Sequence, residues 1–237
     1  MPFTTHGSGH DTARTVERQM RNWELARSQH LTQMHAPQRP PVAHFVTVSR
    51  MVGASGTEVA TAVGARLGWP VFDKQILIAM AGDDEVRTRL YQQLDERDTS
   101  WMEEALRWLL QGEHGKHEFF RRLSETVLAL ARQGPAVFLG RGAEMILPRQ
   151  YGLRVRLIAP REWCVEQVVQ RLGHTPEAAV EYFDRVQHER DEYMRTHFHV
   201  RPGGPPRHDL VINRAQFTLD ATVELIVAAL RLRQGRA

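Results

Sequence analysis

The sequence has little cysteine and no long apolar run, and both absences narrow the class of protein. Cys164 is the only cysteine in 237 residues, which excludes an intrachain disulfide and fits a reducing compartment. The polar N-terminus lacks the apolar stretch of a signal peptide, and no run is long enough to cross a bilayer. We therefore expect a cytoplasmic protein without a membrane partner.

The excess of one sign of charge over the other is also small. The chain carries 31 Lys and Arg against 28 Asp and Glu, a formal net charge of +3, and its arginines are spread along the sequence. Without a basic tract, the composition gives no reason to expect a nucleic acid partner. A small anionic ligand, in contrast, needs only a few of these arginines.

The first 44 residues differ in character from the rest. Residues 11–34 have apolar side chains at near-helical spacing with charges between them, which predicts an amphipathic helix. Residues 35–44, "HAPQRPPVAH", form a Pro-rich linker that cannot continue that helix. Helix 11–34 is available to contact a second copy of the chain or another partner, or to pack on its own core. The sequence leaves these alternatives open.

From residue 45 onward, short apolar runs alternate with helical patterns, which predicts a parallel sheet with helices on both faces. The expected strands are "FVTV", "PVF", "AVFLG", "LRVRLIAP" and "DLVIN". Residues 74–133 are helical in character, with expected breaks at "LDERD" and "QGEHGKH". Ligands bind such sheets at the carboxyl ends of the strands. The residues expected there are Ser49, Arg50, Asp73, Arg141 and Asn213.

A small-residue turn follows the first strand and opens a helix, as expected where backbone N–H groups bind phosphate. The turn is Gly53-Ala54-Ser55-Gly56-Thr57. In a Walker alignment Gly56 replaces the lysine and Glu58 replaces the metal-binding hydroxyl. Arg50 is the nearest substitute cation, and Ser49, Ser55 and Thr57 are candidate hydroxyl donors. The alternative is that this is only a tight strand-to-helix turn.

Taken together, these segments resemble the cytidylate kinase-like branch of the P-loop nucleoside monophosphate kinases over residues 45–232. The matching segments include "VTVSRMVGASGTEVATAVGARLGWPVFDKQIL", "VFLGRGAEMIL", "RDEYMRTHF" and "HDLVIN". The resemblance implies a three-layer α/β/α fold with a five-stranded parallel sheet, a helical acceptor-binding insert at 74–133 and a short lid at about 185–208. It also implies transfer of phosphate from ATP, with Mg²⁺, to CMP, dCMP or a related monophosphate. The branch commonly has a lysine-poor loop of this kind.

The resemblance also implies roles for several charged residues. Asp73 would face the phosphoacceptor, although an Asp-Lys pair also suits the cap of the next helix. Arg141 would grip the acceptor's phosphate. The related motif has an acid directly after this arginine, but here Gly142 follows, so the metal ligands stay unassigned.

The helix before the Pro/Gly loop carries three arginines that resemble those of the lid. Arg190 matches the family position best, and Arg185 and Arg195 are further candidates for the donor phosphates. The alternative is pairing within the helix, Arg185 with Glu189 and Asp191 with Arg195. We interpret His197, His199 and His208 as solvated loop residues and Cys164 as a packed one.

Three functions remain open at this stage. The first is a cytidylate kinase-like phosphotransferase. The second is a non-catalytic nucleotide-binding sensor or partner-binding module, which the missing lysine and Gly142 favour. The third is a kinase of another small acceptor, because a fold does not determine a substrate.

Overall fold

The strands form one parallel sheet at the centre of the chain. The structure is a computed structural model, and it describes residues 14, 17, 18, 20, 42–92, 94, 96–110, 118–200 and 207–235. The sheet has five strands in the order β2-β3-β1-β4-β5, and every neighbouring pair is parallel. The strands are β1 (Phe45–Arg50), β2 (Val71–Phe72), β3 (Ala136–Leu139), β4 (Gly152–Ile158) and β5 (Leu210–Asn213). The expected five-stranded parallel sheet is confirmed.

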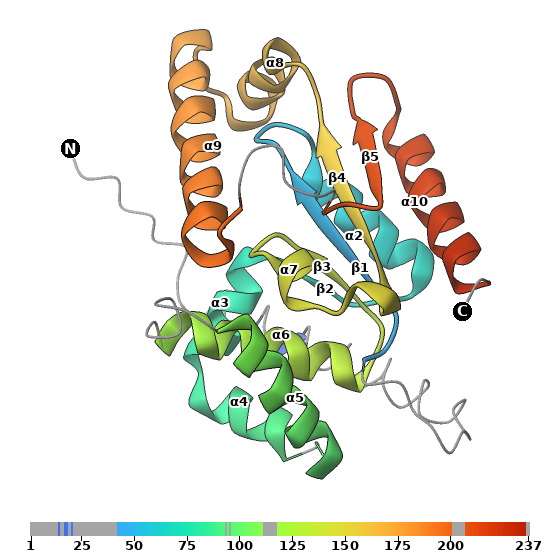
Figure 1. Cartoon of the computed structure of the whole chain (residues 1–237). Helices are drawn as coiled ribbons and strands as arrows, with labels where there is room; N and C mark the ends of the chain where they lie inside the picture. The colour runs from blue at the N-terminus through green and yellow to red at the C-terminus, as the bar shows by residue number, and fades with distance from the viewer. Residues whose placement is uncertain are drawn as a thin grey trace.

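Helices connect the strands and cover both faces of the sheet (Figure 1). Those outside the insert are α2 (Gly56–Leu67), α7 (Ala143–Ile146), the 3₁₀ turn η2 (Arg149–Tyr151), α8 (Arg161–Leu172), α9 (Pro176–Phe198) and α10 (Leu219–Gln234). The local sequence determines where several of these helices begin or end. Gly68 ends α2 in a left-handed conformation, and Thr175 and Thr218 cap α9 and α10 through their side-chain oxygens.

Four helices form the described part of the insert between β2 and β3, and Figure 1 shows them gathered below the strands. They are α3 (Lys74–Gly82), α4 (Asp84–Tyr91), α5 (Glu96–Leu109) and α6 (Glu118–Gln133). The expected break at "LDERD" is partly wrong, because α5 begins inside it at Glu96. A break at Asp83 was not expected; its carboxylate caps α4 by accepting from the N–H groups of Glu85 and Val86. The second expected break, 111–117, lies outside the described residues.

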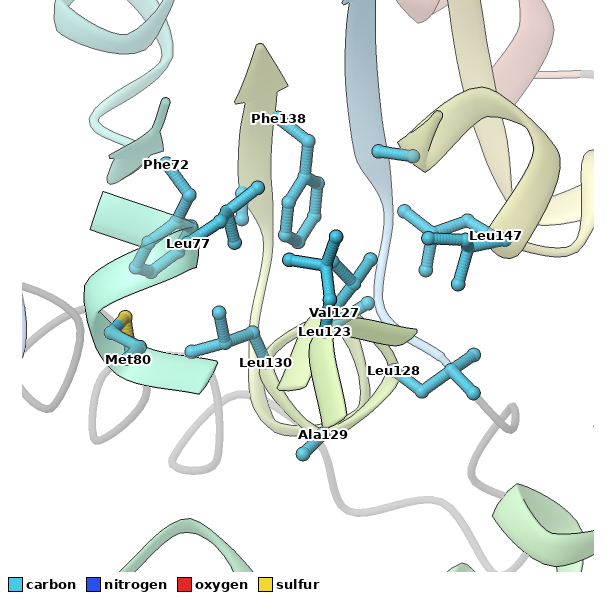
Figure 2. Close-up of a cluster of buried hydrophobic side chains, with 14 of the residues drawn as sticks. Phe72, Leu77, Met80, Leu123, Val127, Leu128, Ala129, Leu130, Phe138 and Leu147 are labelled. Atoms are coloured by element: carbon cyan, nitrogen blue, oxygen red, sulfur yellow. The ribbon is translucent and has the colours of Figure 1, made fainter. Parts of the chain in front are cut away.

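Side chains alternate across the sheet and so form two separate cores. On β3, Phe138 faces the core shared with the insert, whereas Val137 and Leu139 face the core shared with α2, α8, α9 and α10. Figure 2 shows Phe72 and Phe138 directed from the sheet toward Leu77 of α3 and Val127 of α6. The two rings stack with centroids 5.6 Å apart. The insert is thus anchored to the sheet by apolar burial, the main favourable term in folding.

The N-terminal segment contributes one side chain to this core. Met20 has helical backbone and is 3% exposed within the core shared with the insert, whereas Arg14, Glu17 and Arg18 are exposed. At this position the segment packs on its own chain. The remainder of helix 11–34 lies outside the described residues.

The strand order fixes where a ligand can bind. β1 is central, with β3 on one side and β4 on the other, so the carboxyl ends of these strands meet at one edge of the sheet. A search of the described residues for a helix with the length and apolar character of a membrane span finds none.

Candidate functional site

A cavity of about 880 Å³ opens at the carboxyl edge of the sheet. Its walls come from the ends of β1, β3 and β4, the first turns of α2 and α3, the end of α8, α7 and the middle of α9. The polar residues that line it include Ser49, Arg50, Thr57, Asp73, Lys74, Gln75, Arg141, Glu144, Arg156, Tyr182, Arg185, Glu189, Arg190, Asp191 and Tyr193.

Positive charge exceeds negative charge on these walls. Among the described residues, six cationic side chains line the cavity against four carboxylates. Asp73 is committed to backbone hydrogen bonds and Glu189 to Arg185. Burial raises the pKa of Glu144, which favours its neutral form. The cavity therefore suits an anion.

Arg50 crosses the floor of the cavity between two glycines. A Cβ atom at Gly56 would lie 2.6 Å from the Arg50 Cγ, and one at Gly140 would lie 2.2 Å from its Nη1. Burial, with the nearby Arg190, lowers the pKa of Arg50 to about 10, so the guanidinium remains charged at neutral pH. The Arg50 side chain thus lies across position 56, where the sequence lacks a lysine.

The rest of the phosphate loop is held from α8. Gly53 packs on the backbone of Cys164, where an added Cβ would lie 2.3 Å from the Cys164 oxygen. Arg171 donates to Ser55 Oγ at 2.7 Å and to Glu58 Oε1 at 2.5 Å. The close contact of residue 53 with α8 leaves no room for a side chain there. The sequence alone did not indicate this reason for the glycine. Ala54 is buried, and Thr57 lines the cavity.

Ser55 begins α2 without capping it. Its backbone is left-handed, with φ 58°, and its side chain makes no capping hydrogen bond. The first-turn N–H groups of α2 thus have no side-chain cap, which leaves them for an anion.

Ser49 is buried at the end of β1 and bonds to a residue far along the chain. Its Oγ is 2.9 Å from His208 Nε2 and 3.5 Å from Arg156 Nη1. Burial, together with the charges of Arg156 and Arg207, lowers the pKa of His208 to about 4. The interpretation of His208 as a solvated loop residue is wrong, because its ring is mostly buried against Ser49. The same interpretation is wrong for His197, which lies in α9 with its ring packed between Phe120 and Tyr193.

Asp73 caps α3, and Lys74 follows it at the cavity wall. Asp73 Oδ1 accepts from the N–H groups of Gln75 and Ile76, each at 2.9 Å. The capping alternative is therefore present, while the same residue also lines the cavity. The pKa of Lys74 is lowered by burial and by Arg141, Arg190 and Arg50, which places its ammonium group among these cations.

Arg141 lies in a left-handed turn between two glycines. Its φ is 55°, and those of Gly140 and Gly142 are 78° and 69°. Left-handed backbone costs a non-glycine residue about 1–2 kcal/mol, so the turn requires support from its surroundings. The Phe198 ring packs closely on the following residue, so that a Cβ at position 142 would lie 2.1 Å from it. This packing explains why glycine stands where the related motif has an acid.

Helix α9 is bound to the residues that lead from β1 into the phosphate loop. Arg190 Nη1 donates to the Arg50 carbonyl at 3.2 Å, and Gln187 Oε1 accepts from the Val52 N–H at 3.1 Å. Arg185 also lines the cavity but pairs with Glu189 at 3.0 Å, as the intrahelical alternative predicted.

Arg195 is not among the residues that line the cavity. Its side chain is 69% exposed and pairs with Glu192 at 2.5 Å. The expected Asp191–Arg195 pair is wrong, since Asp191 accepts from Gln187 instead.

Several residues at or near the cavity were not predicted from the sequence, among them Arg156, Lys74, Arg171 and Tyr193. Arg156 had a usable signal, because arginines inside an apolar strand are unusual and β4 holds two of them, Arg154 and Arg156. Lys74 stood beside Asp73 but was considered only as part of a helix cap. Arg171 and Tyr193 carried no local signal, since each reaches its partners from the surface of a long helix.

The residues present fit the phosphates of ATP better than they fit a bound metal. The uncapped start of α2 and the cations around it suit phosphate oxygens. Among the described residues, no group of three His, Cys, Asp or Glu side chains could hold a metal ion.

The fold and this cavity together define a P-loop protein with a kinase-like fold. Residues 45–216 match the model of the cytidylate kinase-like family. The chain belongs to that family.

A solved structure supports the fold, and two others are reported with lower scores. A protein of uncharacterized function from Eubacterium ventriosum superposes with a TM-score of 0.63 at 16% identity, covering 79% of this chain and 97% of that one. A gluconokinase from Sinorhizobium meliloti gives a TM-score of 0.45 at 18% identity, covering 84% and 97%. A shikimate kinase from Bacteroides thetaiotaomicron gives 0.42 at 12% identity, covering 78% and 97%.

One curated protein is similar over a shorter segment. A uronate isomerase from Corynebacterium glutamicum is 33% identical over 92 residues, which are 38% of this chain. This chain spans 18% of the length of that protein.

Proposed function

We propose that the chain transfers phosphate from ATP to a nucleoside monophosphate, with CMP or dCMP as the first choice. The observation that carries the proposal is the convergence of Arg50, Arg141 and Arg190 on one cavity beside the uncapped start of α2. Phosphoryl transfer depends mainly on positioning and on stabilising charge on the transferred group.

The donor phosphates and the acceptor phosphate would bind at different parts of this cavity. The donor phosphates would bind the first-turn N–H groups of α2, with Thr57, Arg50, Arg185 and Arg190 around them. The acceptor phosphate would bind Arg141, whose planar guanidinium suits a bidentate contact. ATP would supply the phosphoryl group, and Mg²⁺ would neutralise part of its charge.

The test is direct. The protein is incubated with Mg²⁺·ATP and, separately, CMP, dCMP, UMP, AMP and GMP, and products are followed by phosphorus NMR. We expect diphosphates from at least one pyrimidine nucleotide, and about a tenfold or larger rise in KM for that acceptor in Arg141→Ala, because charge-assisted hydrogen bonds contribute about 1.5–3 kcal/mol. Absence of any product would contradict the proposal.

A second candidate is a nucleotide-binding module without catalysis. It is favoured by the ion pair that holds Glu58 to Arg171 at the start of α2, in place of a metal-binding hydroxyl. Calorimetric binding of ATP without formation of any diphosphate would support this candidate.

A third candidate is a kinase of a different small acceptor. It is favoured by the reach of the cavity, which among the described residues touches the insert and its cap only at Asp73, Lys74 and Gln75. An acceptor without a phosphate would not depend on Arg141 for its charge. Turnover of a sugar-like acceptor that survives Arg141→Ala would select this candidate.

A further inference from the structure

Aromatic side chains from the insert and from α9 pack on one another, and one of them, Tyr193, contacts Arg141. Phe120 of α6 stacks on His197 with ring centroids 4.6 Å apart, and His197 lies 4.5 Å from the ring of Tyr193. Phe120 also meets Phe198 edge to face at 5.4 Å. We call these four residues the aromatic cluster. It joins the insert to the last turns of α9.

Tyr193 contacts Arg141 through two different groups. The Arg141 guanidinium carbon lies over the Tyr193 ring, 5.0 Å from its centroid. The Tyr193 hydroxyl donates to the Arg141 carbonyl at 3.3 Å. One side chain thereby holds both the head group and the backbone of the arginine.

The surroundings of Arg141 make this support necessary. Its backbone is left-handed between two glycines that are themselves left-handed. Within the described part of the chain, its buried Nε atom has no hydrogen-bond partner. The aromatic ring therefore orients the guanidinium, which keeps hydrogen-bond donors available for a ligand.

We propose that Tyr193 is a positioning residue for Arg141 and sets the direction in which its guanidinium faces the acceptor. The role of the acceptor rests on the proposed function. The aromatic cluster fixes Tyr193 in turn, so α6 and α9 together determine the orientation of the arginine.

The kinetic test compares two variants at the same position. Tyr193→Phe keeps the ring and loses the bond to the carbonyl, whereas Tyr193→Leu loses both. We expect the KM for CMP to rise about threefold in Tyr193→Phe and about tenfold in Tyr193→Leu, with kcat within about twofold of the parent, since cation–π and neutral hydrogen bonds have these magnitudes. Tyr151→Leu, a half-buried tyrosine of η2 away from the cavity, is the matched control.

A second measurement is independent of turnover. The Arg141 Nε–H signal, assigned with Arg141→Lys, reports side-chain order through ¹⁵N relaxation. We expect an ordered signal in the parent protein and an order parameter below about 0.6 in Tyr193→Leu, with the Phe variant close to the parent.

The two measurements separate the proposals. If no nucleotide is phosphorylated but Arg141 becomes mobile in Tyr193→Leu, the proposed function fails and the positioning role stands. If Arg141 is equally ordered in the parent and in Tyr193→Leu, or if both variants raise KM equally, the positioning role is overturned.

Discussion

The side chain of Arg50 lies across Gly56, so that a Cβ atom at position 56 would meet its Cγ at 2.6 Å. The loop position at which a Walker lysine would stand is therefore covered by an arginine from the preceding strand. The glycine and the arginine depend on each other, and this dependence can be measured.

Gly56→Ala should destabilise the protein by about 1–2 kcal/mol, because the new methyl group overpacks the Arg50 stem. In an Arg50→Ala background the same change should be neutral or stabilising, since alanine is the better helix former. Urea unfolding of the four proteins in this double-mutant cycle gives the coupling. An identical effect of Gly56→Ala in both backgrounds would show that the two side chains do not compete for space.

Arg50→Ala should lower kcat for phosphoryl transfer by about 100-fold, the typical cost of removing one donor aimed at developing charge. Asn213→Ala is the comparison. Asn213 also ends a strand, but its Oδ1 accepts from the Ala215 N–H and it does not line the cavity. We expect less than about a threefold change there, because no transition-state contact is lost. If steady-state kinetics show a larger loss of kcat in Asn213→Ala than in Arg50→Ala, Arg50 does not take the role of the lysine.

Gly142→Asp restores the acid of the related motif and should be poorly tolerated. The side chain would collide with the Phe198 ring, in addition to adopting a positive φ. Gly173→Asp is a matched control, because Gly173 has a similar φ of 66° and no atom within 4 Å of an added Cβ. We expect Gly142→Asp to cost about 2–3 kcal/mol more than Gly173→Asp in the free energy of unfolding. Equal losses in the free energy of unfolding would mean that the Phe198 ring moves aside at little energetic cost.

His208 should make the folded state sensitive to mild acid. Its pKa is lowered to about 4 by burial and neighbouring arginines, from an ordinary value near 6.5. The unfolded chain therefore binds the proton first. The contribution of His208 is fully present above about pH 6.5 and is lost as the pH falls toward 4, amounting to about 2–3 kcal/mol.

The measurement is unfolding free energy against pH in the parent and in His208→Gln. The raised pKa of Glu144 gives a slope of opposite sign above its ordinary value, and it is present in both proteins. We expect a flatter profile between pH 4 and 6.5 in the variant, and no flattening in His188→Gln, whose residue is exposed. Parallel profiles for His208→Gln and the parent would contradict the assignment.

The sheet could be predicted because each strand carries its signal locally. Phe45, Val46 and Val48 belong to a short apolar run typical of a buried strand, and Pro160 and Pro176 mark the starts of α8 and α9. The arginines at strand ends, Arg50 and Arg141, follow from the same pattern, since parallel strands bring their carboxyl ends together.

The supporting contacts could not be predicted, because they join positions far apart in the chain. The partner of Ser49 is His208, and the neighbour of Gly142 is Phe198. A glycine in the sequence indicates that a side chain would not fit or that φ is positive, but it does not identify which residue packs against it. Gly53 illustrates this limit, because its close neighbour is the backbone of Cys164.

Helix α9 bonds at Gln187 and Arg190 to the residues that lead from β1 into the phosphate loop, and at Tyr193 to the Arg141 turn. Since successive residues of an α-helix are rotated by about 100°, these three side chains share one face only at their present spacing. The spacing along the helix therefore fixes the position of one half of the cavity relative to the other. Inserting or deleting one residue between Arg190 and Tyr193 would disengage one half from the other while leaving every cavity side chain chemically intact.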